Sequence, residues 1–88
     1  MKTTDESNRR AITVEYFAIL REQRGLTRET LTTAASTPAA LYGELHGRHG
    51  FSLPAHAVRA AVNGVLVKSD APLRDGDLVV FIPPVAGG

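Results

Sequence analysis

The strongest constraint on the fold is a run of five apolar residues, Leu78–Ile82, near the end of this 88-residue chain. The run has the length of a strand, but it lacks the polar residue at every second position that a strand exposed on one side shows. Both of its faces therefore need cover. If Val79 and Phe81 face a helix, the other three residues face the opposite way, and we expect an apolar docking surface there. Cover from local loops is the alternative interpretation.

Three segments earlier in the chain supply further elements. Residues 12–17 alternate with the period of a half-buried strand. Residues 28–33 are rich in threonine, which favours a second strand paired to the first. Between these strands, residues 18–24 are good helix formers that end at Gly25, so a short helical turn is predicted there.

The one substantial helix is predicted from Pro38 to about His49. Thr37 is a favourable N-cap, and a proline at the first helical position lacks an N–H that would be unpaired anyway. Apolar residues then recur at helical spacing, and Gly50 ends the pattern. This helix therefore has one face for packing on a sheet.

The second half of the chain is predicted to hold three more strands. After a loop over 51–56, the dipeptide Asn63-Gly64 separates strands at 58–63 and 65–68, because a type I′ hairpin turn needs positive φ at both central residues. Asp75-Gly76-Asp77 makes a last tight turn before the apolar run. The element order predicts an α+β domain, in which one main helix crosses one face of a mixed sheet of about five strands.

Length and composition predict a single domain over 11–82, with a disordered leader over 1–10 and a flexible tail over 83–88. No run in the chain has the length of a membrane span, and the leader holds no apolar stretch, so neither a membrane location nor a secretory signal is expected. The chain has no cysteine, which fits a reducing compartment, and the cytoplasm is the predicted location. The net charge of +1 and scattered basic residues argue against nucleic-acid binding.

Side chains that could carry catalysis are sparse. His46 and His49 lie three apart on the predicted helix and His56 follows, but no acidic or sulfur ligand stands at a recognisable spacing, so no metal site is expected. The simpler interpretation is that histidines near the helix end stay solvated and complement the helix dipole. Asp75 and Asp77 are interpreted as turn residues. The chain is therefore not expected to be an enzyme on its own.

The last six residues, Pro-Pro-Val-Ala-Gly-Gly, favour an end that stands clear of the domain. Pro83 and Pro84 fix φ and favour an extended, unpaired conformation. Gly87 and Gly88 lack the Cβ that would block a narrow channel. The candidate reactive group is the α-carboxylate of Gly88, which is inert until a partner activates it. A frayed terminus without a function is the alternative.

Four sequence patterns together resemble one known family. They are Phe17-Ala-x-Leu-Arg21-Glu22, Val62-Asn63-x-x-x-Val67, Leu73-x-Asp75-Gly76-Asp77 and Pro83-Pro84-Val85-Ala86-Gly87-Gly88. In their order and spacing, over about residues 12–88, they resemble the small subunit of molybdopterin synthase, the MoaD group of the ubiquitin-like MoaD/ThiS sulfur carriers. The resemblance implies a β-grasp fold with the last strand in the middle of the sheet.

The resemblance also implies a chemistry for the tail. An ATP-dependent activating adenylyltransferase, MoeB-like, adenylates Gly88, and sulfur transfer converts the acyl-AMP to a thiocarboxylate. The tail then enters the larger synthase subunit, MoaE-like, where it delivers sulfur to cyclic pyranopterin monophosphate; no permanently bound cofactor is implied. The residues that thread the channel or give reach would be Pro83, Pro84, Val85, Ala86 and Gly87. The residues that contact the larger subunit, by family position, would be Phe17, Arg21, Leu66 and Ile82.

Two other classes of function stay open. A related carrier could serve thiamine or cysteine biosynthesis with the same tail, although the segment that begins at Phe17 and the Pro-Pro spacer favour the pterin pathway. A ubiquitin-like protein modifier, or a plain interaction module, would use the same fold, because a fold does not fix a pathway. For Phe17 and Leu66, burial in the core is the alternative to a partner contact.

Overall fold

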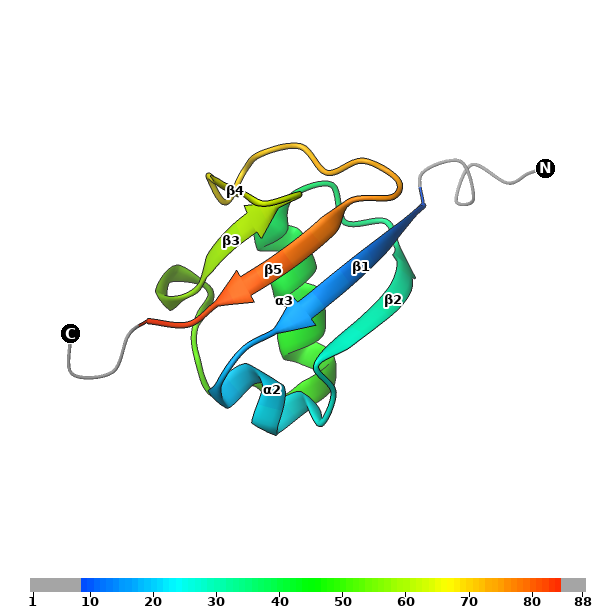
Figure 1. Cartoon of the computed structure of the whole chain (residues 1–88). Helices are drawn as coiled ribbons and strands as arrows, with labels where there is room; N and C mark the ends of the chain where they lie inside the picture. The colour runs from blue at the N-terminus through cyan, green and yellow to red at the C-terminus, as the bar shows by residue number, and fades with distance from the viewer. Residues whose placement is uncertain (1–8, 85–88) are drawn as a thin grey trace.

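The computed structural model describes residues 9–84, and it shows a five-stranded sheet with one long helix across one face (Figure 1). The strands are β1 (Arg10–Tyr16), β2 (Arg28–Thr33), β3 (Arg59–Val62), β4 (Val65–Val67) and β5 (Leu78–Ile82). The helices are α2 (Ile19–Arg24), α3 (Pro38–His49) and the 3-10 turn η1 (Ala55–Ala57). None of the helices within residues 9–84 is long and apolar enough to cross a membrane.

The strands lie in the order β2-β1-β5-β3-β4. β1 and β5 run parallel, and the other neighbouring pairs are antiparallel. β5 thus lies at the centre between β1 and β3, which explains why its sequence shows no polar alternation. This arrangement is the β-grasp fold. The predicted α+β class, the mixed sheet and the central last strand are confirmed.

The hydrophobic core lies between the sheet and α3. From β5, Val79 and Phe81 are buried on the helix side, as predicted. Tyr42 of α3 and Phe81 of β5 pack with their rings in a T-shaped arrangement, with ring centroids 5.3 Å apart. The other core side chains are Ile12, Val14, Tyr16, Leu20, Leu41, Leu45, Phe51, Ala60 and Leu73. Removal of this apolar set from water is the main force that holds the helix on the sheet.

Turn and cap residues end the elements as predicted. Thr37 caps α3 by accepting a hydrogen bond from the N–H of Ala40 at 3.1 Å, and Gly50 ends the helix with φ of 67°. Asn63 and Gly64 have φ of 53° and 88°. Both angles lie in the left-handed region that a type I′ hairpin turn requires.

The structure differs from the predicted bounds at a few ends. β1 begins at Arg10, inside the predicted leader, because Arg10 pairs with Thr33 of β2 and its guanidinium donates to the carbonyl of Ala35 at 2.5 Å. α2 begins one residue late because Ala18 has φ of 54°. The predicted loop over 51–56 contains the start of η1. Of the predicted leader and tail, residues 1–8 and 85–88 lie outside the described residues.

Candidate docking face and carboxyl-terminal site

β5 delivers the chain to its C-terminal segment from the centre of the sheet (Figure 1). Pro83, directly after the strand, is half-buried, and Pro84 is exposed. The four other predicted tail residues, Val85, Ala86, Gly87 and Gly88, lie outside the described residues. The described structure therefore places the start of the tail at the end of the central strand.

That face carries a row of apolar side chains. Directly paired residues project to the same side of a sheet, so Leu66, Ala61 and Val80 form one row across β4, β3 and β5. Leu78 and Ile82 lie on the same side of β5, and we call these five residues the outer face. The three β5 residues are half-buried and Leu66 is 58% exposed, so local loops do not seal it. This surface is therefore a candidate interaction site.

The part of the same side formed by β1 and β2 is polar. Thr13 and Thr30 share a hydrogen bond between their hydroxyls at 3.0 Å, and Glu15 forms an ion pair with Arg28. Both pairs lie directly opposite one another in the β1–β2 register. The outer face is therefore displaced toward β3, β4 and β5.

All four residues predicted to contact a partner are at least partly accessible, and three of them lie on or next to the outer face. Leu66 and Ile82 belong to it, and Phe17 follows β1 at the end of the sheet where β5 also ends. Phe17 is 44% exposed, so the alternative that Phe17 and Leu66 fill the core is wrong. Arg21 is exposed on α2. Their contact with a partner stays a prediction.

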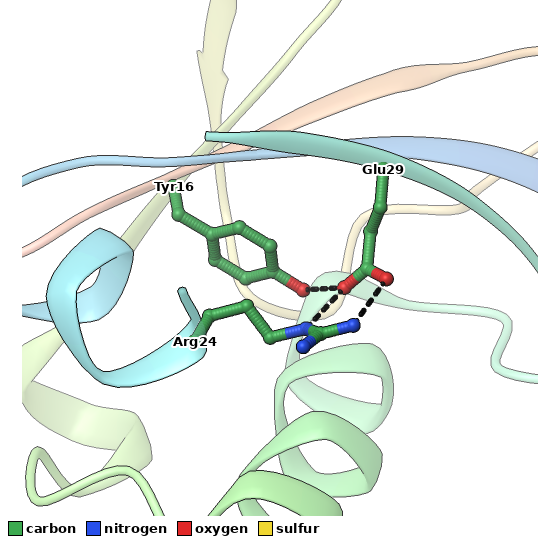
Figure 2. Close-up of polar contacts among 3 residues, drawn as sticks. All are labelled: Tyr16, Arg24 and Glu29. Atoms are coloured by element: carbon green, nitrogen blue, oxygen red, sulfur yellow. Dashed lines mark hydrogen bonds and ion pairs between the residues drawn. The ribbon is translucent and has the colours of Figure 1, made fainter. Parts of the chain in front are cut away.

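A polar cluster links α2 to the sheet (Figure 2). Glu29 of β2 accepts a hydrogen bond from the hydroxyl of Tyr16 at 2.6 Å and two from the guanidinium of Arg24 at 2.8 Å each. We call these three residues the Glu29 cluster. This cluster could not be predicted from the sequence, because the three residues belong to three different elements and follow no known spacing.

The Glu29 cluster keeps its charges and its phenolic proton over a wide pH range. The hydrogen bonds from Arg24 lower the pKa of Glu29 to about 2, although burial acts in the opposite direction. Burial, with the hydrogen bond to Glu29, raises the pKa of Tyr16 well above its ordinary value. At neutral pH the carboxylate is ionised and the phenol stays a donor. The cluster is therefore a permanent link between elements and is poorly suited to exchange protons in catalysis.

The histidines do not come together in one site. Within residues 9–84, no group of three or more His, Cys, Asp or Glu side chains lies close enough to hold a metal ion. His49 is half-buried with its ring centroid 5.8 Å from that of Phe51, and burial lowers its pKa. His49 is therefore less solvated than expected, and burial favours its neutral form, which opposes the predicted interaction with the helix dipole.

Asp75 and Asp77 hold the turn before β5, as predicted. One oxygen of Asp75 accepts the N–H of Ala11 at 2.7 Å. Asp77 accepts the N–H of Arg74 at 2.8 Å and the side-chain amide of Asn63 at 2.9 Å. Both carboxylates are therefore occupied by donors of the chain itself.

Comparison with known proteins decides the family. Residues 14–88 match the ThiS family. The chain belongs to this family. It is 39% identical, over 80 residues, to the molybdopterin synthase sulfur carrier subunit of Escherichia coli strain K12, and the match covers 88% of this chain and 99% of that protein. The resemblance to the MoaD/ThiS carriers, stated above from four sequence patterns, is confirmed.

Two solved structures share the fold of this ThiS-family chain. A putative molybdopterin converting factor, subunit 1, from Pyrococcus furiosus is 31% identical, with a TM-score of 0.71, and the match covers 86% of this chain and 99% of that one. A chain in the complex of subunits 1 and 2 of the Helicobacter pylori molybdopterin-converting factor is 26% identical, with a TM-score of 0.59 and coverage of 89% and 99%.

Proposed function

We propose that this ThiS-family sulfur carrier is the small subunit of a molybdopterin synthase. The observation that carries the assignment is its 39% identity to the molybdopterin synthase sulfur carrier subunit of Escherichia coli over nearly the whole length of that protein. The complex of subunits 1 and 2 from Helicobacter pylori supports a larger partner subunit. The exposed outer face gives such a subunit a place to dock.

In this proposal Gly88 carries the reaction. Its carboxylate attacks the α-phosphorus of ATP on an activating adenylyltransferase, pyrophosphate leaves, and an acyl adenylate forms. A hydrosulfide equivalent then attacks the acyl carbon, AMP leaves, and the product is a thiocarboxylate. The thiocarboxylate sulfur then forms a C–S bond to a side-chain carbon of cyclic pyranopterin monophosphate, while the carbon–oxygen bond at that carbon breaks and the oxygen leaves with a proton or with its phosphate. Water then cleaves the acyl–sulfur bond, so the sulfur stays with the pterin and Gly88 returns to a carboxylate.

The fold supports delivery of Gly88 to a partner. The tail starts after Ile82, which belongs to the outer face, so a subunit that covers this face also receives the tail. Phe17 and Leu66 offer apolar contacts to that subunit, and Arg21 offers a guanidinium fork for a carboxylate or carbonyl. Gly87, without a Cβ, lets the last residues pass a narrow channel.

The chain is proposed to act as a subunit and not as an enzyme by itself. ATP and AMP belong to the activation step on the partner, and no permanent cofactor is assigned to the chain. The MoeB-like activator and the cytoplasmic location stay predictions.

Reconstitution tests the proposed function. Purified chain, the cognate adenylyltransferase, ATP, sodium sulfide, the cognate larger subunit and cyclic pyranopterin monophosphate should together form molybdopterin. A matched chain with one alanine added after Gly88 should form none. A thiocarboxylated chain that binds the larger subunit but gives no molybdopterin would contradict the proposal. Use of the same thiocarboxylate in thiazole or cysteine synthesis would assign the related pathways, and an isopeptide bond to a lysine would assign a modifier.

A further inference from the structure

We propose that residues 17–26, with α2 at their centre, form a prefolded docking element for the larger subunit, and that the Glu29 cluster holds this element in its binding orientation. The inference rests on the proposed function. It gives Tyr16, Arg24 and Glu29 a positioning role, because they act through the surface of the element and do not touch the reacting atoms.

Residues 17–26 hold most of the large apolar side chains that are exposed in the described structure. Within residues 9–84 five large apolar side chains are exposed, and three of them lie here: Phe17 at 44%, Ile19 at 37% and Leu26 at 41%. The other two, Val65 and Leu66, are on β4. Exposed apolar residues gathered in one short segment mark an interaction site. The segment begins with Phe17 at the end of the sheet where β5 ends, next to the outer face, and we assign both surfaces to the same partner.

The helix in this element cannot hold its own position. α2 has only six residues, and helices this short are not stable in isolation. It buries a single side chain, Leu20. Both of its junctions have positive φ, 54° at Ala18 and 82° at Gly25, and alanine adopts a positive φ only when its surroundings enforce it. Contacts from outside the helix must therefore fix its orientation.

The Glu29 cluster supplies these contacts from both sides of the element. Tyr16 precedes the element, Arg24 is the last residue of α2, and Glu29 follows three residues after the element ends. The three side chains meet at one carboxylate, where Arg24 and Glu29 are only 23% and 18% exposed (Figure 2). A bidentate arginine fixes direction as well as distance. Gln23 adds a reciprocal pair of hydrogen bonds with Ser52, each 3.0 Å long.

Loss of the Glu29 cluster should weaken binding of the larger subunit, because residues 17–26 are then no longer held in one orientation. Without it, the element samples several positions and only a fraction of molecules presents Phe17 and Arg21 correctly. The apparent dissociation constant then rises by the inverse of that fraction. Loss of a hydrogen bond of similar strength elsewhere in the fold would lower stability, but it would leave the fraction of molecules with a correctly oriented element unchanged.

The test measures the affinity of the intact chain for the cognate larger subunit, below the unfolding temperature of every variant. Glu29→Gln should weaken binding roughly tenfold, and Tyr16→Phe should have a smaller effect in the same direction. The control is Thr33→Val, at the other end of β2. The hydroxyl of Thr33, which is 1% exposed, donates to Glu44 at 2.6 Å, so this variant loses comparable stability away from α2. It should bind like the wild type.

Two further readouts separate positioning from general destabilisation. In a Phe17→Ala background, Glu29→Gln should weaken binding less than it does in the wild type, because the cluster acts through the same surface. Hydrogen exchange should become faster at the amides of α2 and stay unchanged in α3. If the Glu29→Gln variant binds as tightly as the wild type, or if its binding is weakened no more than that of the Thr33→Val variant, this inference is overturned and the proposed function is unaffected. A wild-type chain that does not bind the larger subunit would overturn the proposed function as well.

Discussion

Asn63 and Asp77 belong to two different sequence patterns, and the structure shows that they form a hydrogen bond with each other at 2.9 Å. Asn63 also accepts the N–H of Leu78 at 2.9 Å, so its side chain ties the hairpin turn to the start of β5. Each residue was predicted in a turn from local preferences alone. Their pairing could not be predicted, because local turn preferences carry no information about a partner on a distant turn.

We predict that Asp77→Ala destabilises the fold by about 2 kcal/mol, because it removes two hydrogen bonds to a carboxylate and leaves the Asn63 amide without that acceptor. Asp77 is only 9% exposed, so water replaces these bonds poorly. Urea unfolding measures the change. The matched control is Asp70→Ala at an exposed position, which should stay within about 0.5 kcal/mol of the wild type. Equal effects of the two substitutions would contradict this role for Asp77.

At the scale of elements, the bounds of β2, α3 and β5 could be predicted to the residue. Their ends are set by short-range chemistry: a glycine before β2, the Thr37-Pro38 start of α3 and the Asp-Gly-Asp turn before β5. The attachment of α2 could not be predicted. A threonine-rich strand gives no indication of which face Glu29 takes, and that face decides whether its carboxylate meets Tyr16 and Arg24.

The Glu29 cluster predicts a pH dependence of stability. The pKa of Glu29 lies near 2 in the folded chain, below its ordinary value of 4.5, so the carboxylate stabilises the fold above pH 4.5 and this contribution is lost as the pH falls toward 2. At pH 7 the wild type should be more stable than Glu29→Gln by about 1–3 kcal/mol. Unfolding measured across this range should show the difference shrinking below pH 4.5. A difference that stays constant down to pH 2 would show that the charge of Glu29 contributes nothing.

At the scale of the whole molecule, the number of strands follows from the patterns, but their order in the sheet does not. The parallel pairing of β1 with β5 joins segments from opposite ends of the described chain, and only the family resemblance implied that the last strand is central. This topology would let a small domain join the proposed docking surface to the proposed reactive end. The start of the tail directly follows a strand of the outer face, so in the proposed function a partner that binds this face also lies next to the start of the tail.

In the proposed function the carboxylate of Gly88 becomes a thiocarboxylate. Intact-mass spectrometry after incubation with the cognate adenylyltransferase, ATP and sodium sulfide can detect this change. We expect the mass increase of one oxygen-to-sulfur exchange, located at Gly88 by fragmentation, and no increase when ATP is omitted or when one alanine follows Gly88. The same increase in the extended chain, or no increase in the chain that ends at Gly88, would contradict it.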